Sequence, residues 1–131
     1  MATTTATLTL SSGDLTGDAL SLSTTATLTK AGTVTGLDQF TGIARKTFSS
    51  TAQVTLIAKA DYTDDRAHKV YLKNTSTVAT ENLIVTIESQ LLGRLYAGDW
   101  ALLPFNGDQD IKITPSVGTA MTVEYAVIYE A

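Results

Sequence analysis

The sequence predicts an all-β protein, an antiparallel β-sandwich that is jelly-roll-like and has about eight strands. Three observations support this fold class. Threonine is the commonest residue, and Val, Ile, Leu and Ala are frequent, which suits a pleated and half-solvated surface. Apolar and polar residues alternate with period two along most of the chain, and no long helical pattern is present. Short clusters of Gly, Asn, Asp and Ser separate the alternating runs, as tight turns require.

The alternation places the strands in order along the chain, and turn residues bound each of them. Glycine and Asn tolerate the positive φ of tight turns, whereas Asp and Ser hydrogen-bond to their own backbone. Short helical segments are also expected, at residues 37–40 and 64–67. The expected strands span residues 4–10, 20–29, 53–59, 69–74, 82–89, 94–97, 110–114 and 121–129.

The chain of 131 residues is expected to form one domain, with an N-terminal arm at residues 1–35 and a sandwich core at residues 36–131. The first part consists mainly of Thr, Ser, Ala, Gly and Leu, and such a stretch buries little area per residue. Its first strand has a small apolar face that offers little to offset the entropic cost of ordering it. We therefore expect this strand to pair with a neighbouring subunit or a shell. Its candidate interface residues are Ala6, Leu8 and Leu10.

One six-residue sequence, TTATLT, occurs at residues 4–9 and again at residues 24–29. A repeat architecture such as a solenoid or propeller would show a longer unit that recurs along the chain. This similarity covers six residues and does not recur, so we interpret it as compositional drift.

The composition argues against several functional classes. The chain has no cysteine, which excludes disulfides, zinc–thiolate sites and thiol nucleophiles. Its formal net charge is −4 and its acidic and basic residues are mixed, so it is a poor candidate for binding nucleic acid. No apolar run approaches the ~20 residues that cross a bilayer, and the first residues lack the pattern of a secretory signal, so no membrane partner is expected.

The motifs of the chain do not predict an enzyme. His68 is the only histidine, it precedes a strand, and no Gly-x-Ser-x-Gly motif accompanies it, so a catalytic triad is not expected. The pairs Asp64–Asp65 and Asp108/Asp110 lie in turn sequences, where aspartate usually caps the backbone. Phosphate-binding glycine motifs are also absent. We therefore expect no catalytic residues, no cofactor and no required metal.

A calcium ion at residues 106–110 is the alternative that the sequence leaves open. Asn106, Asp108 and Asp110 alternate, so their oxygens could converge on a hard cation from a tight loop. The full calcium-loop pattern with its final glutamate is absent, and Asp110 could simply precede the next strand.

The same region contains the only tryptophan and is interpreted as a corner of the sheet. Asn106–Gly107 is a hairpin-turn dipeptide, and Pro104 cannot donate to a ladder, so it belongs at a strand end or an edge. Trp100 and Phe105 are expected to pack there as structural anchors, with the large ring of Trp100 buried over the end of the sandwich.

Several segments then carry a resemblance to a known family. They are KVYLKNTSTVATENLIVTI, GRLYAGDWALLPF, DIKI and TVEYAVIYE, together with a weaker one, TGLDQFTGIARKTF. Their Tyr-x-x-Asn strand end, Ala-Gly-Asp-Trp turn and terminal Val-Glu-Tyr-Ala strand resemble small β-sandwich structural proteins of tailed bacteriophages. The likeness covers about residues 69–131. No functional residue carries over from it, because the family has no active site to map.

The resemblance implies a structural virion protein that is assembled in the host cytoplasm. The leading expectation is a capsid decoration or cement protein that binds the major capsid protein as a homo-oligomer, with a trimer favoured. A neck, tail or fibre component of the virion is the second possibility, and the sequence does not separate head from tail. A third possibility, from another class, is a carbohydrate-binding module with exposed aromatic residues such as Tyr62, Trp100 or Phe105.

Overall fold

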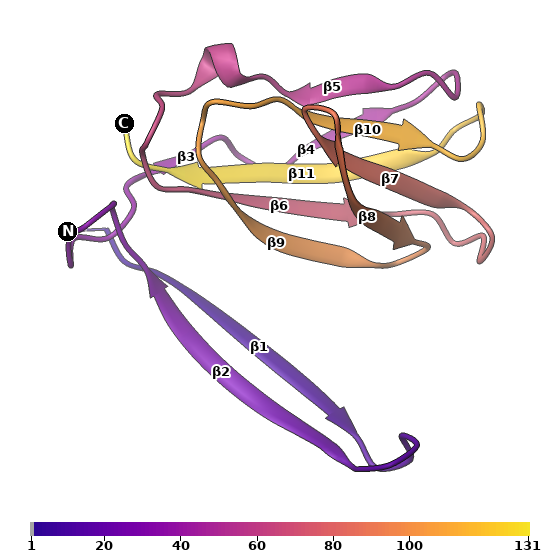
Figure 1. Cartoon of the computed structure of the whole chain (residues 1–131), viewed down its shortest axis with the longest axis horizontal. Coiled ribbons are helices and arrows are strands. Elements are labelled where there is room, and N and C mark those ends of the chain that lie inside the picture. Colours follow the sequence, from indigo (N-terminus) through magenta and orange to yellow (C-terminus); the bar gives the residue numbers. More distant parts are fainter. Residues whose placement is uncertain (1) are drawn as a thin grey trace.

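The computed structural model describes residues 2–131 and shows an all-β protein (Figure 1). A short 3-10 turn, η1 (Lys59–Asp61), is the one helical element within those residues. The strands are β1 (Thr4–Ser12), β2 (Leu20–Leu28), β3 (Gln39–Phe40), β4 (Ala44–Thr47), β5 (Val54–Ile57), β6 (His68–Asn74), β7 (Asn82–Ile87), β8 (Gln90–Tyr96), β9 (Trp100–Phe105), β10 (Ile111–Pro115) and β11 (Thr122–Tyr129).

Strands β3 to β11 form two packed antiparallel sheets. One sheet has the order β5-β10-β7-β8, and in the other β11 pairs with β3, β4 and β6, while β9 follows β6. The pairing is nested, because β7 pairs with β8, β6 with β9, β5 with β10 and β4 with β11. Eight strands that fold back on themselves in this way across two sheets form a jelly roll. The predicted antiparallel sandwich is therefore confirmed.

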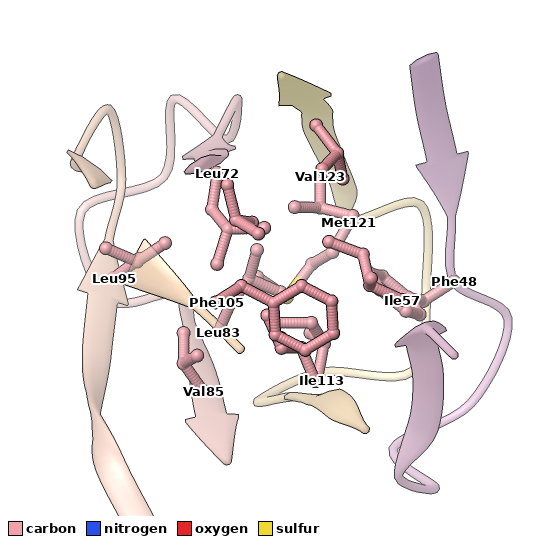
Figure 2. Packing of buried hydrophobic residues seen from close by; sticks show 13 residues of the cluster. Phe48, Ile57, Leu72, Leu83, Val85, Leu95, Phe105, Ile113, Met121 and Val123 are labelled. Atoms are coloured by element: carbon pink, nitrogen blue, oxygen red, sulfur yellow. The ribbon is translucent and has the colours of Figure 1, made fainter. Parts of the chain in front are cut away.

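The core lies between the two sheets, and it follows from the alternation of the strands. In β6 every second residue is buried, and Val70 and Leu72 point inward from it. Leu83 of β7 and Ile113 of β10 point inward from the other sheet and are also fully buried (Figure 2). Burial of such side chains contributes about 1.5–3 kcal/mol each, which makes this cluster the main source of stability.

Several expected elements differ from the structure. The helical segment at residues 37–40 is wrong, because β3 begins within it, and residues 64–67 form a turn and a bend. Strands β3, β4 and β9 were absent from the expected ranges. Two of them are very short, and β9 contains Pro104. Proline is tolerated there because β9 is the edge strand of its sheet.

Strands β1 and β2 form a separate hairpin that projects away from the sandwich (Figure 1). The two TTATLT sequences pair with each other in antiparallel register, so that Ala6 lies opposite Ala26 and Thr7 opposite Thr25. The hydroxyl oxygens of Thr7 and Thr25 lie 3.1 Å apart, within hydrogen-bond distance. The repeat therefore has a structural role, which compositional drift does not explain. We call residues 4–28 the arm.

The base of the arm is fixed to the sandwich by a few specific contacts. Leu28 at the end of β2 and Leu37 are buried, and the Leu37 amide donates to the Leu28 carbonyl at 3.0 Å. The Ala31 amide donates to the carboxylate of Glu130 near the C-terminus at 2.9 Å. Lys30 forms an ion pair with Asp38. These contacts fix the base of the arm to the sandwich, and none of them involves the strands further toward the tip.

The corner between β8 and β9 is held by Asn74, which is fully buried. Its side-chain amide donates to the Leu95 carbonyl at 3.0 Å, and its side-chain oxygen accepts from the Ser76 amide at 3.0 Å. The Asn74 backbone bonds to Gly98 and Asp99 of the turn, with both distances 3.0 Å. These contacts agree with the interpretation of this stretch as a corner. Asn74, the last residue of β6, holds the two sides of the corner together.

We expect Asn74→Ala to lower the free energy of unfolding by roughly 1–3 kcal/mol, because the buried Leu95 carbonyl and Ser76 amide lose their partner. Urea unfolding followed by circular dichroism measures this change. Asn106→Ala is the control, since Asn106 is exposed, and it should stay within about 0.5 kcal/mol of the unaltered protein. Equal losses in the two variants would contradict the role of Asn74.

Candidate interaction surface

The register of the arm places its apolar side chains on one face. Because side chains alternate along a strand, residues that lie opposite each other in the ladder share a face. We call the more apolar side the leucine face. Its apolar residues are Ala6, Leu8, Leu10, Leu20, Leu22, Ala26 and Leu28, and Thr4, Ser12 and Thr24 lie on the same side. The other side, which we call the threonine face, consists of Thr5, Thr7, Thr9, Ser11, Ser21, Ser23, Thr25 and Thr27. The arm is therefore amphipathic along its whole length.

The leucine face is uncovered toward the tip of the arm. Leu10, Leu20 and Leu22 are 40%, 37% and 44% exposed. A two-stranded hairpin is at best marginally stable in water when nothing covers its apolar face. A neighbour was expected to supply backbone hydrogen bonds to the first strand. None is needed for that purpose, because β2 already pairs with all of β1. What lacks a partner is the leucine face, to which Ala6, Leu8 and Leu10 all belong.

The outer surface of β9 is the second apolar feature. Side chains alternate along β9, so Phe105 is buried in the core while Trp100 and Leu102 point outward. Trp100 is 52% exposed, and the expectation that its ring is buried is therefore wrong. The physical reason is the parity of the strand, since two residues five positions apart point to opposite faces.

The leucine face and the outer surface of β9 line the same hollow. Leu8 and Leu10 of the arm form one wall, and Trp100 and Leu102 form the other, around a space of about 640 Å³. A smaller space of about 240 Å³ lies nearer the base, between Ala6, Leu8 and Ala26 of the arm and the same two residues of β9. We call this hollow the wedge. Figure 1 shows the arm diverging from β9 toward its tip. The residues that line the wedge place it between these two elements.

Charged groups border the wedge. Arg94 lines it, and Lys73 lies opposite Trp100 in the ladder of β6 and β9. In residues 2–131 neither cation has an ion-pair partner within 4.0 Å. Asp99 also lines the wedge, and its carboxylate accepts a hydrogen bond from the Tyr96 amide at 2.9 Å. The border of the wedge therefore carries two cations and one carboxylate that is already hydrogen-bonded.

His68 is buried at one end of the sandwich. It is 1% exposed and packs against Tyr62, Phe105 and Tyr129, with ring centroids 5.2–6.2 Å apart. Its Nδ1 lies 3.1 Å from the Phe105 carbonyl. Phe105 is likewise buried and Tyr62 is half-buried, so Trp100 alone of the three aromatic residues considered for sugar binding is exposed.

The loop that could have held calcium directs its polar groups to different partners. The Asn106 amide donates to Asp65 at 3.3 Å, whereas the Asp110 carboxylate accepts from the Lys59 backbone at 2.9 Å. Over the described residues 2–131, no three His, Asp or Glu side chains are grouped so that they could hold a metal. The loop acts as a turn that connects β9 to β10.

The outer face of the β6–β11 sheet contains a compact polar network around Glu124. Arg45 donates to one Glu124 oxygen through Nε and Nη2, at 3.0 and 2.8 Å, and the Tyr71 hydroxyl donates to the other at 3.1 Å. The hydrogen bonds from Arg45, followed by that from Tyr71, hold the pKa of Glu124 below its ordinary value of 4.5. Burial of the Tyr71 hydroxyl, together with Glu124, raises the pKa of Tyr71.

This network predicts a pH dependence of stability. Because the folded-state pKa of Glu124 is lowered, its contribution is fully present above about 4.5 and is lost as the pH falls through the lower folded-state pKa. Glu124→Gln should therefore be less stable than the unaltered protein at pH 7, and the gap should close in acid. Urea midpoints measured from pH 7 down to pH 3 check this. A gap that stays constant over that range would contradict the role of Arg45 and Tyr71.

Comparisons with known proteins assign no family to the chain. No family model matches it, and no curated protein matches it either. No helix among residues 2–131 has the length and apolar character needed to cross a membrane. The arm, the wedge and the fold are therefore the features from which a function can be inferred.

Sequence reasoning found one half of this surface and missed the other. It identified Ala6, Leu8 and Leu10 from the alternation of β1, but it left out Leu20 and Leu22 of β2. The same alternation in residues 20–28, read together with the TTATLT repeat, could have placed both strands in one hairpin with one apolar face. The outward position of Trp100 could also have been found by counting along β9 from Phe105.

Proposed function

We propose that this chain is a structural virion protein of a tailed bacteriophage, namely a capsid decoration or cement protein that binds and stabilises the head lattice. The observation that carries the proposal is the arm, a projecting hairpin whose leucine face the chain itself leaves uncovered. Exposed apolar surface of this kind marks an interaction site. The resemblance of residues 69–131 to phage structural proteins supports the same role.

The proposed role is one of binding and not of catalysis. The jelly-roll body supplies a rigid support, and the arm projects from it (Figure 1). In the proposed role the arm reaches a neighbouring subunit. The proposed partners are the major capsid protein and further copies of this chain, with a trimer favoured at positions of threefold symmetry. A neck, tail or fibre component would use the same arm, and the two roles differ in copy number.

Trp100 supports a second candidate, a carbohydrate-binding module. Its ring is exposed beside the wedge, where Arg94 and Asp99 provide polar groups. Exposed aromatic rings next to hydrogen-bonding side chains suit an amphipathic ligand. Glycan-array binding that Trp100→Ala abolishes, without loss of stability, would favour this candidate.

Deletion of residues 2–27 tests the proposed role of the arm. The sandwich should stay folded, because the arm is attached only at its base and Leu28 is retained. The truncated protein should unfold at nearly the same urea concentration but should no longer remain on purified particles. Retention on the particles with unchanged affinity would contradict the proposal.

The copy number of the chain in those particles separates the head from the tail. Quantitative mass spectrometry of purified virions gives this number directly. Hundreds of copies indicate a decoration protein, whereas about a dozen or fewer indicate a neck or tail component. Absence of the chain from the virion would refute both.

A further inference from the structure

The tip of the arm lies beyond the reach of its own sandwich. A nine-residue strand spans roughly 30 Å, and only its base contacts the body of the protein. Figure 1 shows the turn between β1 and β2 well clear of β9. Leu20 and Leu22 therefore need another molecule to cover them.

The wedge is a surface of matching character on the same chain. Its floor, Trp100 and Leu102, is apolar and exposed, and the space of about 640 Å³ above it is large enough to receive several side chains. Its other wall is the arm, which presents Leu8 and Leu10. A hairpin with one apolar face and one polar face could fill the wedge, with its apolar side chains against both walls and its polar side chains toward solvent. The tip of the arm has these two faces.

The charges of the two surfaces are also complementary. Residues 2–29 contain no Lys or Arg, and their only charged side chains are Asp14 and Asp18, both in the turn at the tip. Arg94 lines the wedge and has no ion-pair partner in the described part of the chain, whereas Asp99, which also lines it, already accepts a hydrogen bond from the Tyr96 amide. Lys73 lies beside Trp100 on the neighbouring strand, and on its other side it lies opposite Glu124. Opposite charges around an apolar contact steer association and fix its orientation.

We propose that the tip of the arm docks in the wedge of a second copy of this chain, with Leu20 and Leu22 over Trp100 and Leu102. The inference deepens the proposed function, on which it rests for the role of the arm in assembly, by naming the partner of the arm. Each copy has both an arm and a wedge, so every copy gives one contact and receives one. Such an exchange closes into a twofold pair or a small ring.

Light scattering coupled to size-exclusion chromatography of the full chain tests the contact. The arm variant is Leu20→Asp with Leu22→Asp, two residues of the leucine face that do not line the wedge. The wedge variant is Leu102→Asp. We expect the unaltered protein to be oligomeric and both variants to be monomeric at the same concentration.

A matched control is available on the same strand. Ser21 and Ser23 follow Leu20 and Leu22 along β2, and both lie on the threonine face. Ser21→Asp with Ser23→Asp adds the same two charges to the arm, and this variant should remain oligomeric. Loss of the oligomer in this control as well would overturn the assignment of the contact to the leucine face.

Mixing the two defective variants gives the sharpest test. The arm variant retains an intact wedge and the wedge variant retains an intact arm, so together they can form one sound contact. We expect them to associate at least 10-fold more tightly with each other than either does with itself. If both are folded, as their thermal unfolding would show, and yet do not associate, the proposal is wrong.

The outcomes for this inference and for the proposed function are distinguishable. A monomeric unaltered protein whose particle binding depends on the leucine face would overturn the second copy as the partner and leave the virion role intact. An oligomer that needs the arm and the wedge, from a chain that is absent from virions, would support the contact and refute the virion role.

Discussion

Leu72→Ala is expected to lower the free energy of unfolding by about 2–5 kcal/mol. Leu72 lies on β6, one of the two central strands of its sheet, and it is fully buried beside the inward-facing residues of the opposite sheet (Figure 2). Removal of its terminal carbons takes away buried apolar contacts and leaves a cavity that rigid neighbouring strands cannot fill. Urea unfolding monitored by circular dichroism measures the loss.

The matched control for Leu72 is Leu91→Ala, the same substitution on β8. Leu91 is 66% exposed, so its truncation should change stability by no more than about 0.5 kcal/mol. A small effect at Leu72, or an equal effect at both positions, would contradict the assignment of the core.

Gly107→Ala is expected to be comparably damaging, with a loss of about 2–5 kcal/mol from two causes that act together. Gly107 has a φ of 91°, which an L-residue with a side chain rarely adopts. A Cβ at this position would lie 2.6 Å from the Thr63 carbonyl oxygen and 3.2 Å from Cε1 of His68. Both neighbours are part of the packed end of the sandwich, so the backbone of the turn would have to move.

Gly42→Ala separates the two causes. Gly42 has a similar φ of 80°, but a Cβ there would meet nothing within 4 Å. This variant should therefore show only the backbone strain, about 1–3 kcal/mol, and remain more stable than Gly107→Ala. The same thermal or urea melts apply to both variants, and the reverse order of stability would contradict the crowding at Gly107.

The strands could be predicted from sequence wherever alternation was long. Residues 69–74 and 121–129 were placed almost correctly, because one face of β6 and β11 is buried and a slip by one residue would expose it. β3 and β4 were missed, since strands of 2 and 4 residues contain too few alternations to show a period. Their presence depends on β11, with which both pair.

The order of strands and the shape of the candidate surface could not be predicted. Pairing of β4 with β11 joins residues about 80 positions apart, and no local pattern encodes such a contact. The leucine face of β1 was visible as alternation, but the divergence of the arm from the sandwich depends on the contacts at Leu28, Ala31 and Leu37. The wedge follows from that divergence and so could be found only in the structure.

The nested pairing of β4 to β11 also has a consequence for the time course of folding. The hairpin of β7 and β8 closes over two residues, whereas each outer pair must wait until a more distant partner has left the ribosome. β3 and β4 are the first strands of the sandwich to be synthesised, and both pair with β11, the last. The arm precedes them all and can form its local hairpin at once, so its leucine side chains are exposed to solvent from an early stage of synthesis. Chaperone capture during translation should therefore concentrate on nascent chains that end before β11.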